Sequence, residues 1–140
     1  MVKLIKLYNN FNIKNAHKSS ILLIGNFDGL HLGHQKLFRL AKKYKKKYSS
    51  KVGVLTFEPM PKMYFNSNLK NFRLSNLNQK IEHLRKFNVD FIIIKKFNQK
   101  FSKTIATDPS QSSLLFPLST IKSGFVHIIC FPKFFSNNSL

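Results

Sequence analysis

The chain has 140 residues, enough for one domain with a buried core, and carries 24 Lys and Arg residues against 5 Asp and Glu. Its single cysteine, Cys130, excludes a disulfide framework and a cysteine-based metal site, and indicates a reducing compartment. The sequence shows neither a signal peptide nor an apolar run long enough to span a membrane, so we expect a soluble, cytoplasmic protein.

The formal net charge of +19 is typical of proteins that bind nucleic acid or anionic membranes. Here the basic residues are scattered, and Lys, Asn, Phe and Ile are all over-used, as A/T-rich codon usage produces. The densest run, residues 42–47, falls on the outer face of a predicted helix and is interpreted as a solvated face. We therefore predict no nucleic-acid partner, and keep a basic RNA-associated protein as an alternative.

The first predicted elements are a strand, a turn and a helix in direct succession. Residues 20–24 are short, apolar and followed by Gly25, which predicts a buried strand. Residues 35–48 show apolar positions at helical spacing, with lysines on the other face. These positions are Leu37, Leu40, Ala41, Tyr44 and Tyr48.

The turn between them, residues 25–34 (the signature turn), has the composition of a phosphate site. It reads Gly-Asn-Phe-Asp-Gly-Leu-His-Leu-Gly-His, and its end falls at the start of a helix. A helix N-terminus offers unpaired N–H groups and positive partial charge, and glycines allow close approach of an anion. His31 and His34 lie three residues apart, so both rings can face one pocket.

The middle of the chain predicts two more strands and one more helix. Residues 52–57 form a strand that Pro59 ends, and residues 91–94 form a fully apolar one. Between them, Ser75 is the expected N-cap of a helix. The apolar stripe of this helix is Leu77, Ile81, Leu84 and Phe87. The alternation of strands and helices predicts an α/β fold with a parallel sheet covered on both faces, and ligands bound at the carboxyl ends of its strands.

Beyond Lys103 the composition changes. Only Lys122 and Lys133 of the 24 basic residues follow it, and Ser, Thr and Pro become frequent. We predict a domain over residues 1–103 and a divergent segment over residues 104–140, with a fourth strand within residues 124–131.

Three blocks of the sequence resemble bacterial FAD synthetases. The signature turn is similar to the G-x-F-D-x-x-H-x-G-H element of HxGH nucleotidyltransferases, and residues 55–61 (Leu-Thr-Phe-Glu-Pro-Met-Pro) resemble the T-F-x-P-x-P loop. Residues 73–82 resemble an R-L-(S/T) element followed by a K-I-x-x-L helix. The resemblance covers about residues 20–101 and implies a Rossmann-like, doubly wound sheet. It also implies FMN adenylylation, in which ATP and FMN give FAD and pyrophosphate with Mg²⁺.

The resemblance implies roles for the signature turn. His31 and His34 would be the catalytic residues, contacting ATP phosphates and stabilising charge as pyrophosphate leaves. The ATP-binding residues would be Gly25, Asn26, Phe27, Asp28, Gly29, His31, Gly33 and His34. Asp28 either shapes the turn by bonding backbone N–H groups or contacts the nucleotide directly.

The flavin side is less determined by the sequence. The resemblance implies flavin binding by Phe57, Pro59, Pro61 and Arg73. Phe57 is either an aromatic wall for the flavin or core, and Arg73 either binds a phosphate or lies unpartnered on the surface. Met60 stands where the family has His, and Lys80 is interpreted as a helix-face lysine.

Other features carry no site. We expect no protein-bound metal, because Asp28, His31 and His34 would have to converge within one turn. No pattern of catalytic or metal-ligating residues accompanies His17, His83 or His127 in the sequence. The family's G-x-D-F-x-F-G loop is not legible at residues 130–136, and its S-S-T-x-I-R element and riboflavin kinase domain are missing from this sequence.

These departures lead to two expectations and leave the alternatives open. We expect weak or absent FAD synthesis by the 140-residue chain, and self-association through an incompletely covered sheet. The alternatives are an inactive remnant of the enzyme and a cytidylyl or pantetheine-phosphate transferase.

Overall fold

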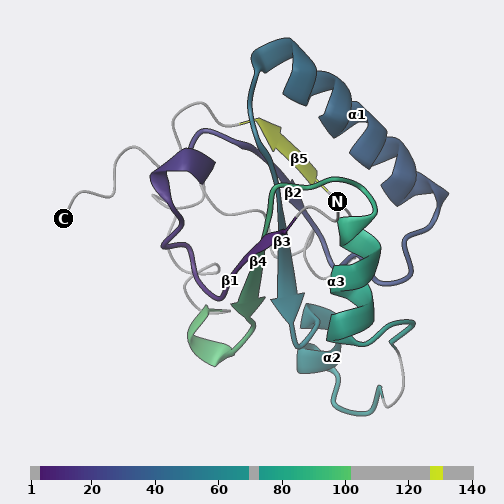
Figure 1. Ribbon diagram of the computed structural model, residues 1–140. Helices are drawn as coiled ribbons and strands as arrows, with labels where there is room; N and C mark the ends of the chain where they lie inside the picture. The colour runs from purple at the N-terminus through teal and green to yellow at the C-terminus, as the bar shows by residue number, and fades with distance from the viewer. Residues whose placement is uncertain (1–3, 70–72, 102–126, 131–140) are drawn as a thin grey trace.

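The computed structural model describes residues 4–69 and 73–101, and the backbone of residues 127–130. Five strands form one sheet in the order β1-β4-β3-β2-β5 (Figure 1). They are β1 (Lys6–Tyr8), β2 (Ile21–Ile24), β3 (Val52–Glu58), β4 (Phe91–Lys96) and β5 (His127–Cys130). Strands β1 to β4 pair in parallel, and β5 runs antiparallel to β2. The predicted α/β fold with a parallel sheet is confirmed.

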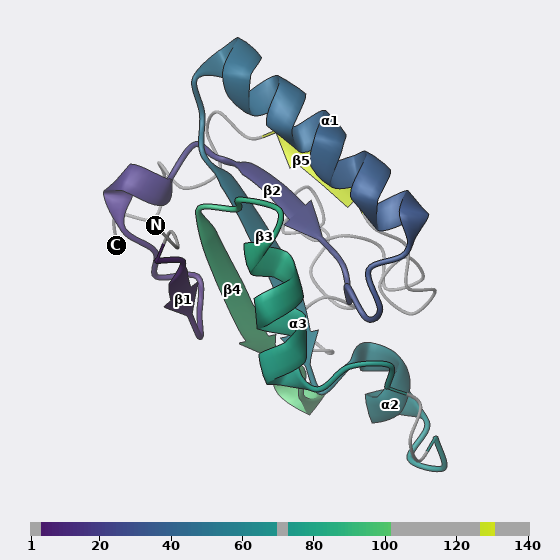
Figure 2. The same cartoon turned by 45° about the vertical axis from the view of Figure 1, so that its right-hand side comes forward.

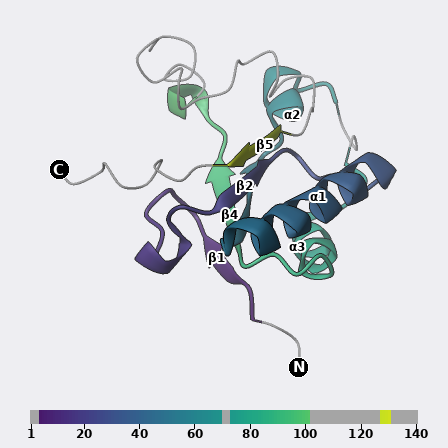
Figure 3. The ribbon, with the colours of Figure 1, turned by 90° about the horizontal axis from the view of Figure 1, so that it is seen from above.

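Two helices cover one face of this sheet. Figures 2 and 3 show α1 (Leu32–Tyr48) and α3 (Leu77–Arg85) on the same side of the strands. Their buried residues, among them Phe38, Ala41 and Leu84, pack in one core cluster with Leu23 and Val54 of the sheet. Alternate strand residues point to this face because side chains in a strand alternate in direction.

A second core cluster fills the opposite face. It holds the intervening strand residues, such as Leu55 and Ile93, and the aromatic side chain of Phe97. Residues from the segment before β2 cover it, including Ile13 of the stretch that leads to the 3₁₀ helix η1 (Asn15–His17). The central strands are therefore buried on both faces, as their unbroken apolar sequences require.

One glycine makes this packing possible. A Cβ atom at Gly53 in β3 would lie 2.2 Å from Cζ of Phe91, which is fully buried on the neighbouring strand. The aromatic ring occupies the volume that any larger residue at position 53 would need.

The predicted strands β2, β3 and β4 and the two long helices are confirmed, with small changes at their ends. Two details were wrong. The N-cap of α3 is Asn76, which forms a capping box with Gln79, because the Ser75 hydroxyl bonds Asp28 instead. The buried face of α1 is carried by His34, Phe38 and Ala41, whereas the expected Leu40 and Tyr48 are exposed.

Three elements were not predicted. Strand β1 has three residues with a single buried one, too few for a period to be visible. The helices η1 and α2 (Pro61–Phe65) span three and five residues, so they show no helical periodicity either.

The apolar run at residues 124–131 contains a strand, as predicted. Strand β5 lies beside β2, so β2 is not an edge of the sheet. This arrangement removes the uncovered central strand on which expected self-association depended, and self-association itself stays a prediction. The rest of the predicted divergent segment, residues 104–126 and 131–140, lies outside the described residues.

Candidate functional site

The signature turn leaves the carboxyl end of β2 and is held in shape by backbone bonds and by unusual dihedral angles. The Gly25 amide donates to the Leu55 carbonyl at 3.1 Å, which ties the turn to β3. Phe27 has φ +49° and Gly29 has φ +60°. At Gly29 a Cβ would lie 2.5 Å from Cδ1 of Leu74, so this glycine also admits the segment before α3.

His31 caps the N-terminus of α1. Its side chain Nδ1 accepts a hydrogen bond from the Gly33 amide at 3.2 Å, and its carbonyl accepts the first helical bond from Gln35 at 3.1 Å. This cap is compatible with the predicted anion site, because it uses Nδ1 of the His31 ring and leaves Nε2 for another partner.

His34 lies on the same side of the helix and is buried. Its ring stacks on that of His31 with centroids 3.8 Å apart and an interplanar angle of 25°, and it contacts Phe27 at 5.2 Å. His34 is 5% exposed, and its Nδ1 has no hydrogen-bond partner among the described residues. A buried, unpaired ring nitrogen is costly, and here it lies at a helix N-terminus.

Burial, together with the neighbouring His31, lowers the pKa of His34 to about 4. The imidazole is therefore neutral near pH 7. A neutral ring has one N–H donor and one acceptor, and an anion placed against it would favour the protonated form.

Asp28 does not face the histidines as a free carboxylate. Its oxygens accept hydrogen bonds from the amides of Leu74 and Ser75 at 2.9 and 2.8 Å, and from the Ser75 hydroxyl at 2.9 Å. The backbone-bonding role predicted for Asp28 is present, but its partners lie in the segment before α3 rather than in its own turn. Asp28 thus joins two of the three sequence blocks.

Lys80 also joins these blocks, and its predicted place on an exposed helix face is wrong. The side chain is 2% exposed, and its Nζ donates to Thr56 Oγ1 at 3.3 Å. Thr56 Oγ1 in turn donates to the Asn26 carbonyl at 3.2 Å. The sequence held a signal for this burial, since Lys80 lies three residues after Leu77 and four before Leu84, on the apolar stripe.

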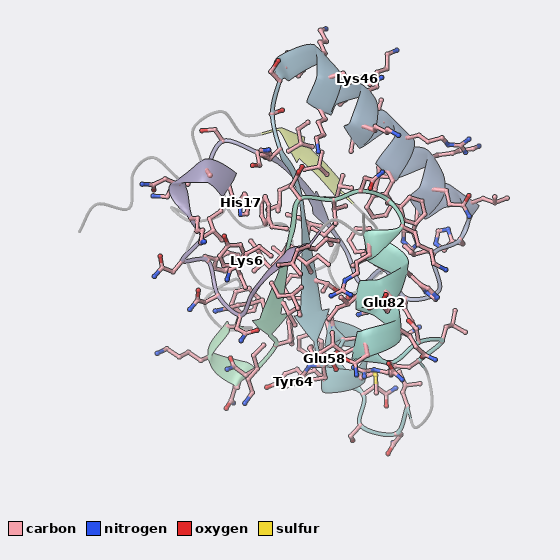
Figure 4. All side chains as sticks on the ribbon, viewed as in Figure 1. Lys6, His17, Lys46, Glu58, Tyr64 and Glu82 are labelled. Atoms are coloured by element: carbon pink, nitrogen blue, oxygen red, sulfur yellow. The ribbon has the colours of Figure 1, made fainter. Side chains whose placement is uncertain are left out.

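The segment that follows β3 is mostly core. Phe57 is 2% exposed and packs on Phe97 and Phe101, each with centroids 5.9 Å away. Met60 and Pro61 are buried, and Pro59 is half-buried. Figure 4 shows Glu58 at this end of the sheet, near Tyr64 of α2.

Arg73 has a partner that the sequence analysis did not consider. Its guanidinium pairs with the carboxylate of Glu58, and both side chains are about a quarter exposed. The predicted alternative of an unpartnered surface arginine is wrong, and phosphate binding by Arg73 stays a prediction.

The remaining candidates lie apart from the signature turn. His17 accepts from or donates to the Tyr8 hydroxyl at 2.8 Å and stacks on Phe91. His83 is on α3, and of His127 only the backbone is described. Among the described residues no three His, Cys, Asp or Glu side chains gather as they would around a metal ion.

The lysine run on α1 is largely exposed, as expected, and Lys46 lies near the C-terminal end of the helix in Figure 4. Lys45 is the exception, because its Nζ lies 2.6 Å from the buried carboxylate of Asp90. In the part of the chain that the structure describes, no helix has the length and apolar composition needed to cross a bilayer. The cytoplasmic location stays a prediction.

Comparison with known proteins gives consistent matches. The family model of FAD synthetase matches residues 13–125. A bifunctional riboflavin kinase/FMN adenylyltransferase of Buchnera aphidicola is 39% identical over 97 residues, which cover 69% of this chain and 31% of the relative. Proteins of the same name from Haemophilus influenzae and Escherichia coli are 37% and 31% identical, over 68% and 75% of this chain and 31% and 33% of their own lengths.

A solved structure shares the fold. It is the crystal structure of a protein described as a macrolide-efflux protein from Streptococcus pneumoniae, with a TM-score of 0.53 and 28% identity over 70% of this chain and 33% of that one. The matched part of this chain spans about a third of each of these proteins. The family match extends beyond residue 103, and the predicted boundary there stays a prediction. Because the family model matches well over half of its residues, the chain belongs to the FAD synthetase family.

Proposed function

We propose that this chain is an FMN adenylyltransferase domain, which transfers the adenylyl group of ATP to FMN. A phosphate oxygen of FMN attacks the α-phosphorus of ATP, and the bond from that phosphorus to the oxygen bridging to the β-phosphate breaks. The products are FAD and pyrophosphate. The names of the relatives include this activity, which supports the proposal.

The observation that carries the proposal is the pair of stacked imidazoles at the start of α1, one of them buried with an unpartnered Nδ1. The transfer needs no protein nucleophile, so the protein contributes positioning and charge stabilisation. His31 and His34 would contact the triphosphate, and the positive end of α1 would favour its negative charge. Gly25, Asn26, Phe27, Asp28, Gly29 and Gly33 would shape the backbone around it.

Magnesium enters this reaction as part of the substrate, MgATP. Asp28, the acidic residue of the turn, already accepts three hydrogen bonds from residues 74 and 75, so it is not arranged as a metal ligand. Triphosphate oxygens and water would complete the shell of the ion, which is the usual arrangement for Mg²⁺.

We place the flavin at the end of β3, next to Pro59, Pro61 and Arg73. Phe57 is buried too deeply to form the wall itself, and would support it from below. The ion pair of Arg73 and Glu58 is partly exposed, and such pairs contribute at most about 1 kcal/mol. A phosphate group of FMN or ATP could therefore replace Glu58 as the partner of Arg73.

The test is FAD formation by the purified chain from FMN and ATP with MgCl₂, followed by chromatography, with ATP binding measured in parallel by calorimetry. We expect ATP binding and slow FAD formation that requires both substrates. His34→Ala should reduce FAD formation by about a hundredfold, while His83→Ala, a change of a histidine outside the site, should leave it unchanged. A chain that neither binds ATP nor forms FAD above the protein-free blank would overturn the proposal.

A further inference from the structure

Among the described residues, no carboxylate pairs with the buried ammonium group of Lys80. In the described part of the chain, its hydrogen-bond partner is the neutral hydroxyl of Thr56, at 3.3 Å. Burying a charge without an opposite charge is strongly unfavourable, so a lysine that is 2% exposed calls for a functional explanation. The other buried ion of the described chain, Asp90, has Lys45 as a counter-ion.

The hydrogen bonds around Lys80 form a chain with a fixed direction. An ammonium group can only donate, so Thr56 Oγ1 must accept from it. The hydroxyl proton of Thr56 is then available to donate to the Asn26 carbonyl, 3.2 Å away. Asn26 lies in the signature turn, directly before Phe27 and its left-handed φ of +49°. A neutral amine at position 80 could instead accept the Thr56 proton and release this carbonyl.

We propose that Lys80 is a positioning residue of the phosphate site, whose ammonium orders the bonds from Thr56 to the Asn26 carbonyl and so fixes the signature turn. This inference rests on the proposed function in one respect, that the turn binds the phosphates of ATP. The ordering itself is a property of the free protein. The side chain thus acts on the ligand through Thr56 and Asn26.

The charges that face Lys80 come from two segments. Arg73, before α3, opposes its charge and Asp28, in the signature turn, favours it. Arg73 is itself paired with Glu58 of β3. Burial is the largest influence, and together with Arg73 it lowers the pKa of Lys80 to about 8. The ordering should therefore weaken between about pH 7 and pH 9.

The first experiment follows the backbone amide of Phe27 by NMR in the whole chain as the pH rises from 6.5 to 9.5. This amide follows the Asn26 carbonyl directly and reports its hydrogen bond. In the wild type we expect it to shift with a midpoint near the pKa of Lys80. The shift should vanish in Lys80→Met and in Thr56→Val, which retain the volume of the side chain, and persist in Thr56→Ser and in Lys86→Met, a change of an exposed lysine at the end of the same helix.

The second experiment measures ATP binding by calorimetry at pH 7 and pH 9. We expect affinity to fall by about tenfold in Lys80→Met at pH 7, as for loss of a charge-assisted hydrogen bond, and the wild type to lose affinity at pH 9 while the variant does not. If Lys80 had only a structural role, wild type and Lys80→Met would show the same change in ATP affinity between pH 7 and pH 9.

The two proposals fail differently. If the Phe27 amide titrates identically in wild type, Lys80→Met and Thr56→Val, the positioning role is wrong, whatever the ATP result. If that titration follows expectation but the wild type does not bind ATP, the ordering stands and the proposed phosphate site fails.

Discussion

The two ends of the parallel sheet hold their buried ionisable side chains in opposite ways. At the amino ends of β3 and β4, the Asp90 carboxylate accepts from the Val52 amide at 2.9 Å and from Lys45 Nζ at 2.6 Å. At the carboxyl ends, His34 Nδ1 has no described partner and Lys80 has a single neutral one. Complete pairing stabilises a fold, whereas incomplete pairing at a strand end next to a helix N-terminus is typical of a binding site. The comparison predicts that mutations at the first end change stability and that mutations at the second change function.

The largest effect should come from breaking the paired end. Asp90→Ala removes the acceptor of a buried amide and the partner of Lys45, and should lower the free energy of unfolding by about 4 kcal/mol. Glu82→Ala is the matched control, because the Glu82 side chain, which pairs with Arg85, is 62% exposed, and its loss should cost under about 0.5 kcal/mol. Urea denaturation measures both. Equal losses in the two variants would contradict a structural role for the Asp90 site.

The next effect concerns catalysis at the unpaired end. His34→Ala should reduce the rate of FAD formation roughly a hundredfold, equivalent to about 3 kcal/mol, because it removes a preorganised group from the developing phosphate charge. His31→Ala should act in the same direction, and both variants should keep their affinity for FMN. Steady-state kinetics and flavin fluorescence separate these effects. Weak FMN binding with a normal rate would show that the histidines bind FMN and do not stabilise the phosphate charge.

The pH dependence of stability offers a third way to sharpen the comparison. The pKa of His34 is about 4 in the folded chain and about 6.5 in an unfolded one. Between these values the unfolded chain binds a proton that the folded chain does not, so this stability is complete above about pH 6.5 and is lost as the pH falls toward 4. The loss should be about 3 kcal/mol by pH 4, measured by denaturation at several pH values, and His34→Gln should lack it. An identical pH profile in that variant would show that folding does not change the pKa of His34.

The smallest effect should be a gain. Lys80→Met replaces an unpaired buried charge by an apolar side chain of similar length, and should leave stability unchanged or raise it by about 1 kcal/mol. This outcome is the opposite of that for Asp90→Ala. Thermal unfolding measures this change. A large loss of stability would mean that Lys80 stabilises the whole fold and is not a positioning residue of the signature turn.

The parts of this molecule that follow a local rule could be predicted from the sequence. Strands β2 to β4 are apolar runs, and the turn before α1 combines glycines with two histidines, so both were recognised. The three-residue strand β1 has no period to detect. The pairing of Arg73 with Glu58, and of Asp28 with Leu74 and Ser75, joins residues far apart in sequence, and no local pattern contains it.

Lys80 shows a different kind of limit. Its spacing places it on the apolar stripe of α3 and indicates burial. Lysine side chains are nevertheless almost always exposed in proteins, so the sequence favoured a surface position. The spacing of three residues predicted that His31 and His34 face the same side, while the contact of His34 with the Phe27 ring, with centroids 5.2 Å apart, had no signal in the spacing. Such tertiary contacts decide which polar groups are left without partners.

The central claim is that the incompletely paired end of the sheet receives the phosphates of ATP. The most direct measurement is a pH titration of the ¹⁵N-labelled imidazole of His34 by NMR, without and with millimolar ATP. We predict a pKa near 4 in the free chain and a rise toward neutrality with ATP, because phosphate charge favours the protonated ring. An unchanged pKa and unchanged His34 resonances at saturating ATP would contradict the account.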